Sequence, residues 1–324
     1  MKKNSVLSSI RLIAFIMIIA CHILQGLNNF LAFWVNLGVQ IFFFLSGYLY
    51  GMKELDNYTE FYKKRIFKIL IPNAILIISM LIVDKAFFNV EYSLSIILAN
   101  LLGFGGFYGT LNTLSHTWFV SYILICYLIT PILDIILKKS NSKRKIMVIV
   151  IMLFLLDFFH VVNVNSAWVC NYVFGFWYTR CLEEKSKTKF FLLVIFMSLI
   201  TLPLKIIVTY RLIPLPNIIV NYSSYILNWT HVLLGISLFL IFYKIFSKIK
   251  PKYNKLLYFS DKYSYTIYLT HQIFILNYLS LLQFTNNLFV NIIFALICAM
   301  LSGYLLNIVS NYVEKLLLKR IKKT

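Results

Sequence analysis

Apolar segments recur along the whole chain and are separated by short polar stretches. A helix of about 20 apolar residues is long enough to cross the hydrocarbon core of a bilayer. We place ten such spans, at residues 6–27, 33–52, 66–86, 117–137, 146–163, 166–180, 190–210, 222–243, 262–282 and 287–313. Helices satisfy their own backbone hydrogen bonds in lipid. The pattern therefore predicts an all-α polytopic integral membrane protein with about ten transmembrane helices, built as one membrane-embedded domain over residues 1–324. Eight spans with a re-entrant stretch is the alternative.

The positive charges predict the orientation of these spans. With the N-terminus placed in the cytoplasm, 27 of the 31 Lys and Arg side chains fall in inner segments. Only Lys85, Lys205 and Arg211 fall in outer segments, and Arg11 lies within the first span. Lys and Arg are enriched in cytoplasmic loops, so both termini are predicted to be cytoplasmic. A cleaved signal peptide is an alternative for the first span, but Arg11 lies very close to the apolar run and no clear small-residue cleavage site follows.

Composition excludes several classes of protein. Hydrophobic residues make up 60% of the chain and the mean hydropathy is +0.82, which excludes an ordinary soluble domain. The net charge of +20 is divided among short clusters between spans, so it indicates a bilayer and not nucleic acid as the partner. The five cysteines show no C-x-x-C spacing. No Walker A, G-x-S-x-G or H-E-x-x-H motif is present, and no metal site is predicted.

The first span holds two ionisable residues, Arg11 and His22. Eleven steps of about 100° return to nearly the same helix face, three turns further on. Ionisable side chains at membrane depth are costly and usually functional. Histidine can act as a general base near neutral pH, and arginine can bind phosphate or carboxylate. This spacing predicts that the pair serves a phosphorylated donor on the cytoplasmic side. The alternative is a snorkelling arginine and a packed histidine.

Other polar residues extend this candidate site. Arg65 and Lys68 share a helix face at the inner mouth of the third span and could contact donor phosphates. Ser46, in an aromatic run, could offer a hydroxyl, although helix packing also explains it. His116 and Trp118 open the fourth span at the outer face and could line an acceptor pocket. The longest outer loop, residues 87–116, contains four glycines and could contribute to binding.

Five stretches together resemble the acyltransferase-3 family of integral membrane acyltransferases, which modify sugars of bacterial envelope polysaccharides. They are Arg11-x10-His22, GVQIFFFLSGYLYG (38–51), FYKKRIFKILIP (61–72), SHTWFVSYILICYLITPIL (115–133) and SYTIYLTHQIF (264–274). The stretches follow the family's order and spacing across nearly the whole chain. Lys68 stands where the family has a second arginine, and Gln40 where it usually has an acidic residue.

The resemblance implies a membrane O-acyltransferase. It implies a cytosolic acyl-CoA donor, usually acetyl-CoA, with no permanently bound cofactor. The acceptor would be an extracytoplasmic hydroxyl of a polysaccharide or lipid-linked sugar, and the location a bacterial cell membrane. The alternative functions are a transporter or flippase for a lipid-linked glycan precursor, or a non-catalytic assembly protein.

The resemblance also implies roles for particular residues. His22 and Arg11 match the family's essential pair on the first helix, so both are candidate catalytic residues. Arg11 is in addition a candidate donor-binding residue, together with Arg65 and Lys68. His271 matches a recurrent family position. It completes the candidate substrate-binding set, which consists of His116, Trp118, Ser46 and His271.

Overall fold

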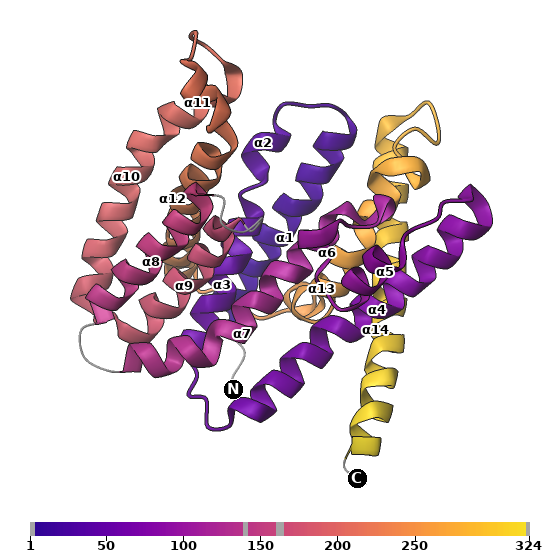
Figure 1. Ribbon diagram of the computed structural model, residues 1–324, viewed down its shortest axis with the longest axis horizontal. Helices are drawn as coiled ribbons and strands as arrows, with labels where there is room; N and C mark the ends of the chain where they lie inside the picture. Colours follow the sequence, from indigo (N-terminus) through magenta and orange to yellow (C-terminus); the bar gives the residue numbers. More distant parts are fainter. Residues whose placement is uncertain (1–3, 139–141, 160–164, 322–324) are drawn as a thin grey trace. The chain divides into compact units, whose positions relative to one another are not determined.

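The computed structural model describes residues 4–138, 142–159 and 165–321 (Figure 1). Across these residues the chain is helical and contains no strand. The elements are α1 Ser5–Gly26, α2 Ala32–Val35, α3 Gly38–Gly51, α4 Tyr58–Phe88, α5 Leu94–Leu101, α6 Gly105–Tyr108, η1 Asn112–Thr117, α7 Trp118–Lys138, α8 Ser142–Phe158, α9 Ser166–Cys181, α10 Glu184–Tyr210, α11 Asn217–Asn221, α12 Ser223–Ile249, α13 Lys255–Ile275, η2 Asn277–Leu279 and α14 Leu288–Ile321. The all-α fold class is thus confirmed.

The helices form two compact units. Unit 1 comprises residues 1–14, 37–56 and 128–253, and unit 2 comprises residues 15–36, 57–127 and 254–324. Residues 5–14 and 15–26 of α1 therefore belong to different units, as do the two halves of α7. The single membrane-embedded domain stays a prediction, and each unit is described separately.

Unit 1 is built on a close contact between α3 and α9. A Cβ atom at Gly47 would lie 1.9 Å from the backbone oxygen of Tyr172, and one at Gly175 would lie 2.1 Å from that of Phe44. Only glycine permits such an approach of two helix backbones. Helix α12 packs against both α3 and α9, α10 packs on α12, and α8 packs on α9. The small residues of the 38–51 segment thus determine its helix packing.

Unit 2 is built around α13, which packs against α4, α14, η1 and η2. A Cβ atom at Gly303 of α14 would lie 2.7 Å from the Cα of Ile267. The Thr270 hydroxyl also donates a hydrogen bond to the backbone oxygen of Ala299, at 3.0 Å. Glycine and a threonine hydroxyl therefore hold α13 directly against α14.

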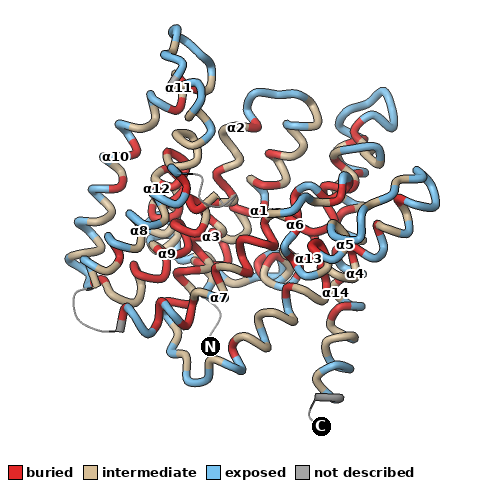
Figure 2. Tube along the Cα trace, viewed as in Figure 1, coloured by how far each residue is buried: buried red, intermediate tan, exposed pale blue. Residues whose placement is uncertain are grey.

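The outward surfaces of the helices are apolar. On α8, Met147, Ile151 and Met152 are at least half exposed, as are several apolar residues of α10. Figure 2 shows these exposed residues as pale-blue turns along both helices. Such extended apolar surface is expected where helices face lipid.

Seven helical segments are long and apolar enough to cross a membrane, judged by length and composition over the described residues. They are Ser5–Gly26, Ala32–Gly51, Tyr58–Phe88, Asn112–Leu137, Glu184–Tyr210, Ser223–Ile249 and Leu288–Lys319. The other three predicted spans correspond to α8, α9 and most of α13, although residues 160–163 of the fifth span lie outside the described part of the chain. A polytopic membrane protein is confirmed, while the number of ten crossings and the cytoplasmic termini stay predictions.

Several helix boundaries differ from the predicted spans, and at α4 and α13 local capping explains the difference. Helix α4 begins at Tyr58, eight residues before the predicted span, since the Asn57 side chain accepts a hydrogen bond from the Glu60 amide at 2.9 Å. Helix α13 begins at Lys255 and ends at Ile275, against a prediction of 262–282. Asn254 caps its start, and Asn277 adopts a positive φ of 67° just beyond its end.

The predicted outer loop 87–116 is organised by a buried carboxylate, Asp84. Its two oxygens accept hydrogen bonds from the hydroxyls of Tyr92 at 2.8 Å, Tyr278 at 2.5 Å and Thr113 at 3.3 Å. These residues lie after α4, in η2 and in η1. Burial and then the hydrogen bond to Asp84 raise the pKa of Tyr92 to about 12, so this hydroxyl keeps its proton at neutral pH. One carboxylate therefore joins three segments of unit 2.

Replacing Asp84 with alanine should leave three hydroxyls without their acceptor and lower the free energy of unfolding by about 2–4 kcal/mol. Thermal unfolding of the purified protein in detergent measures this change. Glu91→Ala is the matched control, because the Glu91 carboxylate is exposed and pairs with Lys85 at the surface, where ion pairs contribute little. Equal midpoints for the two variants would contradict the role given to Asp84.

Candidate active site

Three histidines from distant parts of the sequence meet inside unit 2. His22 lies on α1, His116 on η1 and His271 on α13. The ring centroids of His22 and His271 are 4.8 Å apart, those of His116 and His271 are 5.2 Å apart, and those of His22 and His116 are 6.3 Å apart. His116 and His271 are buried, and His22 is partly buried. The structure thus brings together three of the residues predicted from sequence.

A hydrogen bond joins the first two of these rings. Nε2 of His271 lies 2.8 Å from Nδ1 of His22, and Nδ1 of His271 lies 2.6 Å from the backbone oxygen of Tyr268. Among the described residues, Nε2 of His22 has no hydrogen-bond partner. The hydrogen-bonding capacity of this nitrogen is therefore unused within the described chain.

His116 has a different environment, because both of its ring nitrogens face groups of α13. Nδ1 contacts the side-chain oxygen of Gln272, and Nε2 lies 3.0 Å from the backbone oxygen of Leu269. The same Gln272 oxygen accepts hydrogen bonds from the His116 amide at 2.8 Å and from the Ser115 hydroxyl at 3.1 Å. The Tyr268 hydroxyl donates to the backbone oxygen of His116 at 2.6 Å. His116 thus anchors η1 to α13.

Two of the three cationic residues predicted to bind the donor, Arg65 and Lys68, lie near the start of α4. Arg65 is partly buried and Lys68 is exposed. Lys68 lines a cavity of about 280 Å³ between α4, α13 and α14, whose other polar lining residues include Asp261, Thr266 and Glu314. At 1.5 Å per residue, Thr266 lies about 8 Å along α13 from His271. Helix α13 therefore contributes both to the lining of the polar cavity and to the histidine pair.

The remaining predicted site residues are distributed over both units. Trp118 begins α7 and packs edge-on against Tyr122, with ring centroids 5.9 Å apart. Arg11 lies in the part of α1 that belongs to unit 1, and Ser46 lies on α3 of the same unit, next to the tightly packed Gly47. Arg11 and Ser46 therefore belong to a different unit from the histidine cluster.

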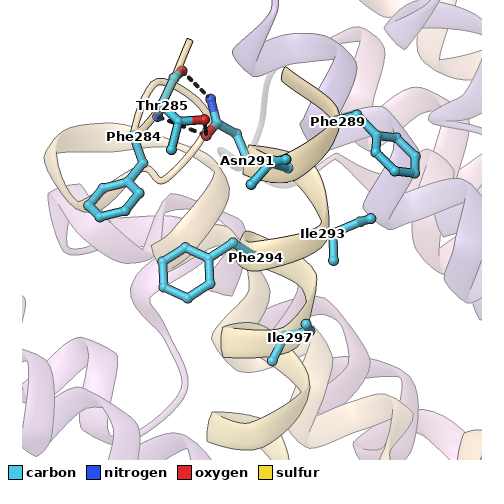
Figure 3. A pocket seen from close by; sticks show the side chains of 8 residues that line it. Phe284, Thr285, Phe289, Asn291, Ile293, Phe294 and Ile297 are labelled. Carbon is cyan, nitrogen blue, oxygen red and sulfur yellow. Dashed lines mark hydrogen bonds between the residues drawn. The ribbon is translucent and has the colours of Figure 1, made fainter. Parts of the chain in front are cut away.

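A second cavity of unit 2, of about 380 Å³, is apolar and lies along the first turns of α14 (Figure 3). Its lining is mainly aromatic and aliphatic, and includes Phe284, Phe289 and Phe294. The one amide side chain there, Asn291 of α14, is bound to the preceding loop. Its oxygen accepts from the Thr285 amide at 2.8 Å and its nitrogen donates to the backbone oxygen of Thr285 at 2.8 Å. This groove offers mainly apolar contact.

Sequence inspection missed Gln272, Tyr268 and Asp84. The signal for Gln272 was its position next to His271 in an otherwise apolar helix end, since two adjacent polar residues there must both find partners. Within the described residues, no group of three or more His, Cys, Asp or Glu side chains is arranged to hold a metal ion. The chemistry that the histidine cluster itself offers is that of imidazole groups.

The fold and this cluster define a class of protein: a multi-pass helical membrane protein with a hydrogen-bonded histidine pair in its interior, one ring nitrogen of which has no partner among the described residues. Comparison with protein families then identifies the group within that class. The family model of the acyltransferase-3 domain, described as an acyltransferase domain, matches residues 5–308. The chain belongs to the acyltransferase-3 family and is a membrane acyltransferase. No curated protein and no solved structure matches it.

Proposed function

We propose that the protein is an O-acyltransferase of a bacterial cell membrane that moves an acyl group, foremost acetyl, from cytosolic acyl-CoA to a hydroxyl of an extracytoplasmic sugar. The acceptor belongs to an envelope polysaccharide or a lipid-linked precursor. The observation that carries this proposal is the free Nε2 of His22, whose other ring nitrogen is hydrogen-bonded to His271 at 2.8 Å. A histidine oriented in this way is suited to accept a hydroxyl proton.

The donor side of the proposal rests on the cations of α4. Arg65 and Lys68 lie one helical turn apart, and Lys68 opens onto the polar cavity between α4, α13 and α14. In this proposal they bind the phosphates of CoA, whose acyl thioester extends toward His22. In the same proposal His116 and Trp118 belong to the acceptor side, while donor binding by Arg11 stays a prediction from sequence.

Replacing Lys68 with alanine should raise the KM for acyl-CoA by about tenfold with little change in kcat, since one charge-assisted contact to phosphate is lost. Lys68→Arg should restore the KM, because it keeps the charge and can donate two parallel hydrogen bonds to one phosphate. Initial rates over a range of acyl-CoA concentrations measure both. Lys64→Ala is the control, since Lys64 lies one turn away and pairs with Glu60 at 2.5 Å. A KM that responds equally to Lys64→Ala and Lys68→Ala would contradict a specific contact.

Proton NMR of surface polysaccharide tests the proposed reaction. The polymer is compared between the parent strain, a strain lacking the gene, and that strain complemented with wild type or His22→Ala. O-acyl signals should vanish on deletion and return only with the wild type, and their chemical shifts would locate the acylated position. A polymer that keeps all of its acyl groups but falls in amount would favour transport or assembly instead.

A further inference from the structure

The His22–His271 contact joins two side chains on separate helices with nearly parallel rings. The ring planes differ by only 9°, and the centroids are 4.8 Å apart. This separation is close to the largest that a nitrogen–nitrogen distance of 2.8 Å allows. The contact is therefore a hydrogen bond between ring edges and not a face-to-face stack of the two rings.

The partners of His271 determine which ring nitrogen carries its proton. The backbone oxygen of Tyr268, 2.6 Å from Nδ1, can only accept, so Nδ1 of His271 must donate. A neutral imidazole carries one N–H, and burial of an unpaired cation is costly at a fully buried position such as this one. Nε2 of His271 is therefore an acceptor, and the proton in its hydrogen bond to His22 belongs to Nδ1 of His22.

The same reasoning extends to His22. Because Nδ1 of its neutral ring carries the proton, Nε2 holds a lone pair, and this is the nitrogen without a partner among the described residues. We infer that His271 is a positioning residue, which fixes the tautomer and ring plane of His22 and thereby directs the Nε2 lone pair to the acceptor hydroxyl. The inference rests on the proposed function and assigns His271 a role other than substrate binding.

The proton movements in this scheme balance. Nε2 of His22 takes the proton of the acceptor hydroxyl as the hydroxyl oxygen forms a bond to the acyl carbon. The bond between that carbon and the CoA sulfur then breaks, and the proton on Nε2 passes to the thiolate to give free CoA. His271 accepts the Nδ1–H hydrogen bond throughout and keeps its own proton on Nδ1. The same hydrogen bond stabilises the imidazolium form of His22 between the two steps.

Two substitutions of His271 separate positioning from bulk packing. In H271Q the amide oxygen can replace Nε2 as the acceptor, whereas H271L fills similar space without an acceptor. In purified wild-type and variant proteins, we expect H271L to lower kcat by about 100-fold or more with KM values within about twofold. The kcat of H271Q should be at least about tenfold higher than that of H271L. The two variants should unfold at similar thermal midpoints.

Each outcome decides a specific point. Full kcat in H271L, or H271Q no better than H271L when both are folded, would overturn the positioning role. A rise in KM for the acceptor with unchanged kcat would assign His271 to substrate binding instead. If wild type shows no acyl-CoA turnover, or His22→Ala keeps full turnover, the proposed function itself fails, so the two failures are distinguishable.

Solid-state NMR of the wild-type protein gives a test that does not depend on the folding of a His271 variant. Protein labelled with ¹⁵N in its histidine rings is reconstituted in lipid, and the His22 signals are assigned by their loss in His22→Ala. An unprotonated Nε2 and a protonated Nδ1 on His22 are expected. A protonated Nε2 with a bare Nδ1 would overturn the inference.

Discussion

His22→Ala is expected to abolish acyl transfer, with a fall in kcat of at least about 100-fold, because removal of a general base typically costs 10²–10⁴ in rate. Release of free CoA from acyl-CoA by purified protein in the presence of acceptor measures the loss. The amount of protein in the membrane should not change, since His22 is only partly buried and its side chain has a single hydrogen bond within the described chain, to His271.

Gln25→Ala provides the matched control on the same helix. Gln25 lies nearly one turn beyond His22 and is exposed, so its removal should leave kcat and KM unchanged. Undiminished turnover in His22→Ala would remove His22 from the mechanism. An equal loss in Gln25→Ala would show instead that α1 as a whole tolerates no change, and that the effect is not specific to the imidazole.

Gly47→Val is expected to prevent correct folding of unit 1. Its Cβ would meet the backbone oxygen of Tyr172 at 1.9 Å, a contact that no side-chain rotation can relieve. The helices α3 and α9 must then separate, at a cost of about 1–3 kcal/mol or more. Size-exclusion chromatography and thermal unfolding in detergent should show little folded protein.

Ser46→Ala is the neighbouring control for this prediction. Ser46 is partly buried and adjoins Gly47 on α3, and the substitution removes only a hydroxyl, so the thermal midpoint should stay near that of the wild type. The same variant also tests Ser46 as a substrate-binding residue, through its KM for the acceptor. A stable Gly47→Val protein would contradict the packing described for α3 and α9.

Much of the helical fold was predictable from sequence because lipid imposes one dominant constraint. Apolar runs of suitable length locate the long helices, although several helix ends differ from the predicted spans by four to eight residues. Errors occur where local hydrogen bonds extend a helix into polar sequence. At α4 this is the Asn57 cap, which adds a charged turn from Tyr58 onward that hydropathy does not detect.

The three histidines of the candidate site could be singled out from sequence, but their arrangement could not. His22, His116 and His271 each stand out as ionisable residues in apolar sequence, yet nothing in their spacing shows that His22 and His271, 249 positions apart, share a hydrogen bond. Gln272 is missed for a related reason, since its side-chain oxygen is satisfied by η1 and not by its own helix. Contacts of this kind depend on packing between helices, which periodicity within one helix does not encode.

The polar character of α13 has a consequence for how the protein is made. This helix is long enough to cross a bilayer, yet it is not among the described segments that are apolar enough to do so, because it carries charged residues and many hydroxyl and amide groups. Several polar groups of α13 form hydrogen bonds to neighbouring elements, such as that from the Thr270 hydroxyl to the backbone oxygen of Ala299 in α14. Gly303 of α14 lets the two helices pack closely. During synthesis α14 emerges after α13. The helix that carries His271 therefore depends, for stable insertion, on a partner translated after it.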